Sequence, residues 1–380
     1  MSAPIPSSRP RLAALDGLRF FAALAVLSYH YLGMEREYFG APPSEVFPTA
    51  HRFAGLGAYG VDLFFVISGF VIFMTAYRRP LRDFIASRIA RLYPAYVVAV
   101  ALCALLLGFL FTDVKDVKLA NVALNFTMFQ EGFGEQNLDG VYWTLWSELR
   151  FYILIGILMA VGGLTRTRAL AFAGLWPLLA GVAATTDSSL VRTILLTGQA
   201  PWFAAGMALF ILTLDRRSLL AWLVLAENAL LCMSPYAIGG FSDVIHRNAG
   251  VEVRQTGQVA VVVLCIGLPA LAALTPLRHV SWKPLTTAGL LTYPLYLTHE
   301  YWGWWLISEL HDSLPPLATL AITICFALAL AYALNRFVER PLGPLVRRAI
   351  RGDLARTEPG SDAPPPSPPP AGGALGVSGR

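Results

Sequence analysis

The chain has 380 residues, of which 56% are apolar and only 14% are charged, and its formal net charge is +5. This composition excludes a single soluble globular domain and favours a polytopic membrane protein. The excess of positive charge lies mainly in segments predicted to face the cytoplasm, so it indicates membrane orientation rather than nucleic-acid binding.

Apolar runs long enough to cross a bilayer core of about 30 Å as helices recur along most of the chain. They predict an all-α protein with about ten transmembrane helices. We place these helices at residues 12–33, 57–76, 95–112, 141–163, 169–186, 193–214, 218–234, 257–274, 285–307 and 317–337. After about Gly352 the sequence is rich in proline, glycine and serine, which predicts a disordered tail over residues 352–380.

The distribution of basic residues predicts how these helices are oriented. With the N-terminus inside, the inner segments hold more than twice as many Arg and Lys residues as the outer segments. Both termini should therefore be cytoplasmic. The first apolar run is too long for a cleavable signal peptide, so we expect it to remain as an anchor.

The four cysteines fall inside apolar runs and show no metal-ligand or redox spacing, so we expect packed thiols. The sequence also lacks a Gly-rich phosphate loop, a Gly-x-Ser-x-Gly elbow and a His-Glu-x-x-His motif. We therefore expect neither a bound metal nor ATP hydrolysis.

The first apolar run contains the stretch LRFFAALAVLSYH, which carries Arg19 and His30. Eleven positions turn an α-helix by about 1100°, close to three full turns, so the two side chains share one face. They are about 16 Å apart along the axis and therefore mark two depths of one cavity. Snorkelling of Arg19 to the headgroups and a plain interhelical contact of His30 are the alternative interpretations.

Further polar groups lie in the second and fourth runs. GVDLFFVISGF places Asp62 near the outer mouth, and its small residues Ser68 and Gly69 mark a spot where another helix or a ligand could approach closely. WTLWSELRFY places Glu148 about 10 Å inside the outer boundary, near the depth predicted for His30. Either carboxylate could orient His30 and stabilise its protonated form, with His30 acting as the general base. Alternatively, Asp62 could cap its own helix, and Glu148 could form a structural ion pair with Arg150 or with a group on another helix.

The inner loop YRRPLRDFIASRIARLYP is rich in arginine, and topology alone explains most of this charge. Arg88 and Arg91 are three residues apart on a predicted short helix, so their guanidinium groups point the same way and could grip a phosphate. Near the outer end of the ninth run, LTYPLYLTHEYWGWW carries His299 and Glu300, of which His299 is a candidate site residue. Glu339 follows the last run and should pair with an inner-loop arginine.

Together these segments resemble the acyltransferase 3 family of integral membrane O-acyltransferases. LDGLRFFAALAVLSYH is similar to the family's Arg-x10-His pattern, GVDLFFVISGF to its second-helix signature, and FIASRIARLYP to its Arg-x-x-Arg loop. WTLWSELRFY resembles its Trp-Ser-Leu-x-x-Glu-x-x-Phe-Tyr pattern with Thr144 in the serine position, and LTYPLYLTHE and FVERPL resemble its late-helix and closing motifs. The resemblance runs from about residue 12 to residue 342, which we take as one membrane-embedded acyltransferase domain.

The resemblance implies transfer of an acyl group, usually acetyl, from cytoplasmic acyl-CoA to a hydroxyl of a carbohydrate or glycosylated acceptor, by a multi-pass protein of the inner membrane. It implies His30 as the catalytic base, which we expect Glu148 or Asp62 to assist. Donor binding is expected of three arginines, Arg19, Arg88 and Arg91. Substrate contacts are expected of Ser68, Tyr152 and His299. The expected partners are acyl-CoA, the carbohydrate acceptor and the lipid bilayer, without nucleic acid or metal.

A transporter or exporter of a small solute or lipid-linked intermediate is an alternative, with the polar stripe lining its pathway. Such a protein needs no grip on CoA, so its inner-loop arginines would tolerate replacement by lysine. Succinyl or longer-chain acyl transfer is a second alternative, which leaves all the named residues in place and changes only the pocket shape.

Overall fold

The computed structural model describes residues 12–352. Within this range the chain forms α-helices, short 3-10 helices and π-helical turns, without a strand, and the all-α prediction is confirmed. The predicted tail lies outside the described residues, apart from Gly352 at its start.

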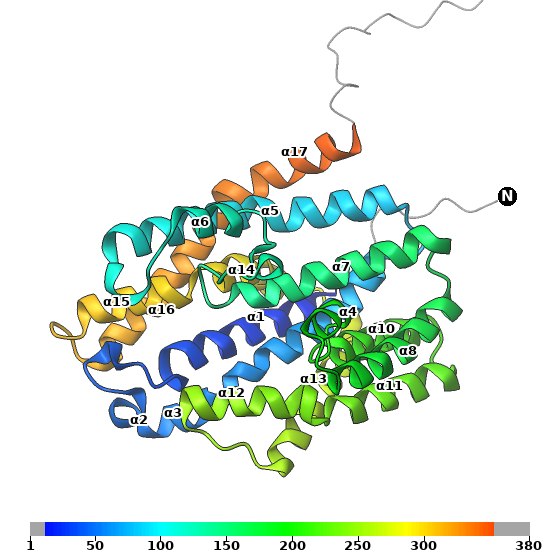
Figure 1. Ribbon diagram of the computed structural model, residues 1–380, viewed down its shortest axis with the longest axis horizontal. Coiled ribbons are helices and arrows are strands. Elements are labelled where there is room, and N and C mark those ends of the chain that lie inside the picture. The colour runs from blue at the N-terminus through cyan, green and yellow to red at the C-terminus, as the bar shows by residue number, and fades with distance from the viewer. Residues whose placement is uncertain (1–11, 353–380) are drawn as a thin grey trace, which may run out of the picture.

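The first half of the described chain forms seven α-helices, and π-helical turns extend two of them. α1 continues into a π turn at Tyr29–Gly33, and α5 continues into one at Leu106–Leu110. The helices are α1 (Ala13–Ser28), α2 (Pro43–Val46), α3 (Pro48–Ala54), α4 (Gly60–Ala76), α5 (Leu81–Leu105), α6 (Leu119–Asn125) and α7 (Tyr142–Gly162). The long helices of this set lie roughly side by side, and the short helices α2 and α3 lie at one end of the molecule (Figure 1).

The second half adds ten α-helices, including two that nearly join and one that follows a π turn at Asn335–Glu339. They are α8 (Arg166–Ala184), α9 (Ser189–Leu195), α10 (Ala200–Leu214), α11 (Leu219–Cys232), α12 (Gly240–Ala249), α13 (Gln255–Leu274), α14 (Lys283–Thr298), α15 (Glu300–Leu310), α16 (Pro316–Leu334) and α17 (Arg340–Arg351). His299 is the single residue between α14 and α15. Each of the ten predicted apolar runs therefore contains helix.

Seven helices in the described part of the chain are long and apolar enough to cross a membrane. The number rises to eight if α11 and the segment Pro235–Ala249, which meet at a bend of 47°, form one span. The prediction of about ten is higher because it counted α1, which carries Asp16 and Arg19, and the broken pair of α14 and α15. The chain is a polytopic helical membrane protein on these features.

The centre of the bundle is the crossing of α4 and α10, where two glycines let the backbones touch. A Cβ atom added at Gly69 would lie 2.0 Å from the carbonyl oxygen of Phe203, and one at Gly206 would lie 2.0 Å from that of Val66. The small-residue spot predicted at Ser68 and Gly69 thus admits another helix. This close approach fixes α4, whose side chains line the site described below.

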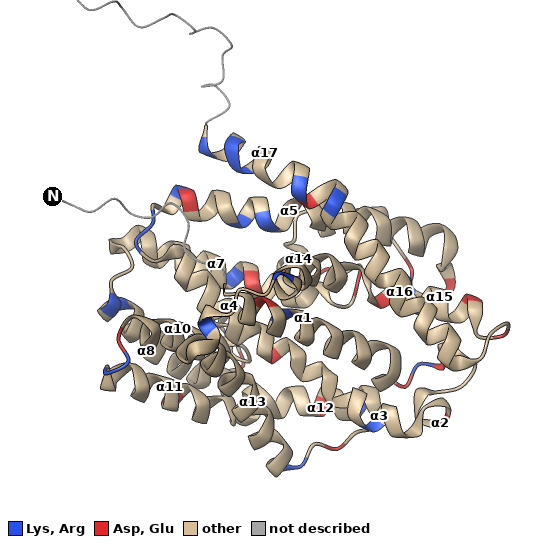
Figure 2. Cartoon of the chain, turned by 180° about the vertical axis from the view of Figure 1, so that it is seen from behind, with Lys and Arg blue, Asp and Glu red and all other residues tan. Residues whose placement is uncertain are grey.

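Basic residues gather on α17, on the first half of α5 and on loops at the same end of the bundle (Figure 2). α17 lies along α5, where Arg351 pairs with Asp83 at 2.8 Å and Arg82 donates to the carbonyl of Ile350 at 3.4 Å. These are the segments that the distribution of basic residues predicts to face the cytoplasm. Of the four thiols, all free, three are buried as expected, whereas Cys325 is exposed on α16.

Candidate active site

His30 lies in the π turn that ends the first helix, a local geometry that often marks functional sites. Its Nδ1 lies 2.9 Å from the carbonyl oxygen of Val26 and 3.1 Å from Nε2 of His299. The indole of Trp304 donates to the carbonyl oxygen of His30 at 2.9 Å, so the backbone of the turn is anchored as well. His30 is thereby held in one orientation by groups from two distant parts of the chain.

The hydrogen-bond network assigns the tautomers of the two histidines. Nδ1 of His299 lies 3.1 Å from the carbonyl oxygen of Leu295 and 3.0 Å from that of Tyr296, so this nitrogen carries the proton. Nε2 of His299 is then an acceptor, and Nδ1 of His30 must donate because both of its neighbours accept. Nε2 of neutral His30 therefore carries a lone pair and is the atom available as a base.

His299 lies at the junction of α14 and α15 and is almost fully buried, at 1% exposure. The hydroxyl of Tyr31 donates to its carbonyl oxygen at 2.7 Å, which holds the break between the two helices against the end of α1. The break brings the next residue, Glu300, toward His30 as well. Its Oε2 lies 3.9 Å from Nε2 of His30.

Asp139, in the loop before α7, forms an acid pair with Glu300. The two carboxyl groups share a hydrogen bond, and the backbone N–H of Val141 donates to Oδ1 of Asp139 at 3.1 Å. Burial raises the pKa of Asp139 to about 6. Because two touching carboxylates cannot both be ionised, the pair holds one proton near neutral pH.

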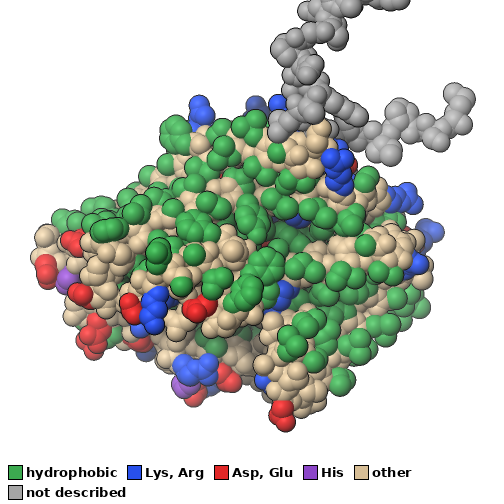
Figure 3. Space-filling model, turned by 45° about the horizontal axis from the view of Figure 1, so that its top comes forward, with side chains coloured by type: hydrophobic (Ala, Val, Ile, Leu, Met, Phe, Trp, Pro, Cys, Tyr) green, Lys and Arg blue, Asp and Glu red, His purple; other side chains and the backbone are tan. Residues whose placement is uncertain are grey.

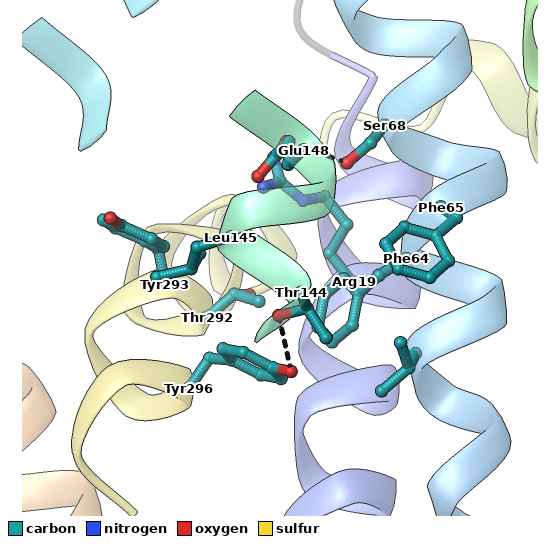
Figure 4. A pocket seen from close by; sticks show the side chains of 11 residues that line it. Arg19, Phe64, Phe65, Ser68, Thr144, Leu145, Glu148, Thr292, Tyr293 and Tyr296 are labelled. Atoms are coloured by element: carbon teal, nitrogen blue, oxygen red, sulfur yellow. Dashed lines mark hydrogen bonds between the residues drawn. The ribbon is translucent and has the colours of Figure 1, made fainter. Parts of the chain in front are cut away.

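Arg19 lines a separate small pocket between α1, α4, α7 and α14 (Figure 4). Its guanidinium lies beside the carboxyl of Glu148, which accepts a hydrogen bond from Ser68 at 3.1 Å. Across the pocket, the hydroxyls of Thr144 and Tyr296 are 2.8 Å apart. The structure thus brings together three predicted site residues on one wall. The pocket volume is about 50 Å³, enough for a water or two.

Glu148 and His30 therefore belong to different clusters, although the sequence placed them at one depth. Glu148 faces Arg19 and Ser68, whereas His30 faces His299 and Glu300. The alternative ion pair of Glu148 with Arg150 does not form either, since Arg150 donates to Ser147 and to the carbonyl of Thr193. Arg19 and His30 thus belong to two separate side-chain clusters, and the pocket that Arg19 lines does not include His30.

Tyr296 joins the two clusters. Its ring lines the Arg19 pocket, and its ring centroid lies 5.8 Å from that of His299. Its carbonyl oxygen lies 3.0 Å from Nδ1 of the same histidine. Tyr296 thus contacts both the Arg19 pocket and the His30 cluster.

Asp62 lies in the first turn of α4 and is buried, at 6% exposure. Its neighbours include the thiols of Cys232 and Cys265 from α11 and α13. Its Oδ2 has no hydrogen-bond partner among residues 12–352. Asp62 thus lies near a helix N-terminus, but no capping hydrogen bond of its side chain is formed within residues 12–352.

Arg88 and Arg91 lie on the basic half of α5, as predicted, but their contacts differ. Arg91 forms an ion pair with Glu339 at 3.1 Å, which confirms the predicted pairing of that glutamate with an inner-loop arginine. Arg88 lies over the ring of Tyr152, 5.7 Å from its centroid, and has no carboxylate ion partner within residues 12–352. Arg88 is therefore the arginine of this pair that is open to an anionic ligand.

A groove of about 450 Å³ runs between α5 and α7 beside Arg88. It is lined almost wholly by apolar side chains of both helices, with Arg88 and Tyr152 among them. Figure 3 shows a face covered largely by hydrophobic side chains and hollowed between ridges, with Lys or Arg atoms visible inside. Tyr152 of the groove and Glu148 of the Arg19 pocket lie one turn apart on α7.

The sequence did not single out Asp139 or Glu300 as site residues. Glu300 adjoins His299 in an aromatic-rich stretch, and an acidic residue next to a candidate histidine was the available signal. Asp139 lies in an irregular loop with no periodicity that would have predicted its partner. The described part of the chain contains no cluster of three or more His, Cys, Asp or Glu side chains that could bind a metal ion.

The family of this chain follows from its similarity to known proteins. A family model described as an acyltransferase domain matches residues 12–336. The chain belongs to the acyltransferase 3 family. The resemblance drawn from the sequence motifs is thereby confirmed. No solved structure is similar enough to this family member to match.

Three curated relatives illustrate the range of this acyltransferase family. The chain is 24% identical over 330 residues to a Bacillus subtilis protein named "Putative peptidoglycan O-acetyltransferase YrhL", which covers 76% of this chain and 48% of that protein. It is 34% identical over 95 residues to acyltransferase MdmB of Streptomyces mycarofaciens, or 25% of this chain and 24% of that protein. It is 47% identical over 53 residues to exopolysaccharide production protein ExoZ of Rhizobium meliloti, and this match covers 13% of this chain and 16% of that protein. The chain thus spans about half or less of the length of each relative.

Proposed function

We propose that this protein transfers an acyl group, most often acetyl, from acyl-CoA to a hydroxyl of a carbohydrate or glycosylated acceptor, with His30 as the general base. The observation that carries the proposal is the orientation of His30, whose Nε2 is left as a lone-pair acceptor by two fixed hydrogen bonds. A base held in this way, with 11% of its side chain exposed, suits removal of a proton from an attacking hydroxyl. Family membership supplies the reaction class.

In the proposed reaction, Nε2 of His30 takes the proton of the acceptor hydroxyl as its oxygen attacks the thioester carbonyl. The carbon–sulfur bond then breaks, and the CoA thiolate takes the proton from the imidazolium. The hydrogen bond from Nδ1 of His30 to Nε2 of His299 keeps the ring in the required tautomer throughout. His299 is thus a positioning residue, rather than a substrate contact, in this proposal.

The donor is expected to reach His30 from the basic side of the molecule. The phosphates of CoA cannot enter hydrocarbon, so they would remain near Arg88 and Arg91 at the start of α5. The pantetheine arm would pass along the groove beside Tyr152 and into the Arg19 pocket. Because that pocket holds only about 50 Å³, side chains lining it must move to admit the arm.

The side chains that would move are identified by their hydrogen bonds. Glu148 holds the Ser68 hydroxyl and faces Arg19, so a shift of Glu148 would free both groups for the donor. We propose that Glu148 and Ser68 act here, on the donor path, and that Arg19 contacts the thioester arm. Asp62 remains a proposed acceptor-side residue only through its place at the outer end of α4.

The names of two relatives support a carbohydrate acceptor. One is named for O-acetylation of peptidoglycan and another for exopolysaccharide production. Both names concern envelope or secreted polysaccharides, so we propose an acceptor of that class and a location in the inner membrane. The alternative of a transporter gains no support from a particular observation.

The donor assignment is tested by thermal stabilisation of the purified protein in detergent by acetyl-CoA, CoA and desulfo-CoA. We expect acetyl-CoA and CoA to raise Tm for the wild type, and the rise to disappear when Arg88→Ala and Arg91→Ala are combined. The matched control is Arg192→Ala, on the short helix α9, which lines neither the pocket nor the groove. No stabilisation of well-folded wild type by any of the three would reject the donor assignment and favour transport.

A further inference from the structure

Glu300 carries an unsatisfied acceptor atom beside the proposed base. The side chain is buried, at 5% exposure, and its Oε2 has no hydrogen-bond partner among residues 12–352. Burying a carboxyl oxygen without a partner is costly, so such an atom is expected to meet a ligand or an ordered water. The atom lies 3.9 Å from Nε2 of His30, which is the lone-pair acceptor assigned above.

The position of the Glu300 carboxyl is enforced by the backbone around it. A Cβ atom added at Gly140 would lie 2.5 Å from one carboxyl oxygen of Glu300 and 2.6 Å from the other. Only glycine at this position lets the carboxyl lie against the loop. Asp139 then binds Glu300 from the same loop, and Lys115 anchors the loop by donating to the carbonyls of Asn137 and Leu138 at 2.5 Å and 3.2 Å.

The separation of the two acceptors limits what can bind them. At 3.9 Å they are too far apart to be joined by one direct hydrogen bond. Neighbouring hydroxyl groups on one sugar ring can each donate to one of them. A ligand with a single hydroxyl satisfies only one acceptor, and an anionic group would be repelled by the charge of the acid pair.

We propose that Glu300, held by Asp139 and Gly140, binds the acceptor substrate by accepting a hydrogen bond from the hydroxyl next to the one that His30 deprotonates. This inference rests on the proposed acyl transfer and names its acceptor class, an uncharged carbohydrate with vicinal hydroxyls. The negative charge of the Asp139–Glu300 pair also stabilises the imidazolium formed when His30 takes the proton. No covalent bond to the pair is involved.

The test uses small alcohols as acceptors, so that it does not depend on the natural polymer. Transfer of labelled acetyl from acetyl-CoA to cis-cyclohexane-1,2-diol and to cyclohexanol is compared in the purified full-length protein, with hydrolysis by water as background. The wild type should use the diol about tenfold better, as expected for one additional hydrogen bond to a charged group. Glu300→Leu, which removes the acceptor oxygen, should reduce this preference to near one, and Glu300→Gln, which keeps an acceptor oxygen, should restore part of it.

Two further measurements separate a binding role from a structural one. The KM for acetyl-CoA should be the same in the wild type and in Glu300→Leu, because the proposed donor contacts lie on the other side of Tyr296. Glu309→Leu is the matched control, since Glu309 is an exposed acid on the same helix, α15. It should leave the preference for the diol unchanged.

The outcomes distinguish this inference from the function on which it rests. If the wild type neither binds nor hydrolyses acetyl-CoA, the proposed function itself is contradicted. Normal hydrolysis of acetyl-CoA without a preference for the diol would overturn only the acceptor site. A preference retained in folded Glu300→Leu, or equal losses in Glu300→Leu and Glu309→Leu, would overturn it as well.

Discussion

Replacing Gly206 by alanine tests the close crossing of α4 and α10 that holds the site together. The added Cβ would lie 2.0 Å from the carbonyl oxygen of Val66 and 2.7 Å from the backbone nitrogen of Phe70. Both are backbone atoms, so no rotamer change can relieve the contact, and the helices must separate by about 1 Å. A gap of that size removes a quarter to a half of the dispersion energy of the facing atoms.

We expect Gly206→Ala to lower the free energy of unfolding by about 3 kcal/mol or more, at the upper end of overpacked cores. This corresponds to a fall in Tm of about 5 °C or more for a chain of this size. Thermal unfolding in detergent measures it, with Gly267→Ala on α13 as the matched control, because a Cβ there meets nothing within 4 Å. Equal Tm values for the two variants would refute the crossing as described.

Two further predictions concern polar contacts. Glu339→Gln removes the ion partner of Arg91, so the Kd for acetyl-CoA should stay equal or fall, whereas Arg91→Ala should raise it about tenfold, as measured by titration calorimetry. If Glu339→Gln bound acetyl-CoA more weakly than Arg91→Ala does, Arg91 would not be a donor-binding residue. Thr144→Val and Tyr296→Phe each break the same hydrogen bond, and each should cost about 1 kcal/mol of stability. A double-mutant cycle should show that the two losses do not add, and full additivity would mean that the bond contributes nothing.

The sequence identified Arg19 and His30 because ionisable side chains inside an apolar run are costly and therefore stand out. It also predicted that Glu339 pairs with an inner-loop arginine, because a carboxylate close to several arginines in a membrane protein is expected to form an ion pair. Helix arithmetic was less successful beyond α1. It assumed ideal α-helix as far as His30, whereas the structure has a π turn at Tyr29–Gly33 that changes where the side chain points.

The contact between helices could not be predicted in the same way. Depth along an axis says how far in Glu148 lies, but not which neighbouring helix it faces. The crossing of α4 and α7 turns Glu148 toward Ser68, and the break at His299 brings Glu300 to His30 instead. Both outcomes depend on packing between segments far apart in sequence, which periodicity within one segment does not encode.

The most direct test of the account is the comparison of donor binding and thioester cleavage in the wild type and in His30→Ala. The account predicts that acetyl-CoA raises Tm equally in both, because its proposed contacts lie on the basic side of Tyr296. It also predicts that the variant releases CoA at least about 100-fold more slowly, as expected for loss of a general base. Cleavage at the wild-type rate in His30→Ala would contradict the central claim that Nε2 of His30 removes the acceptor proton.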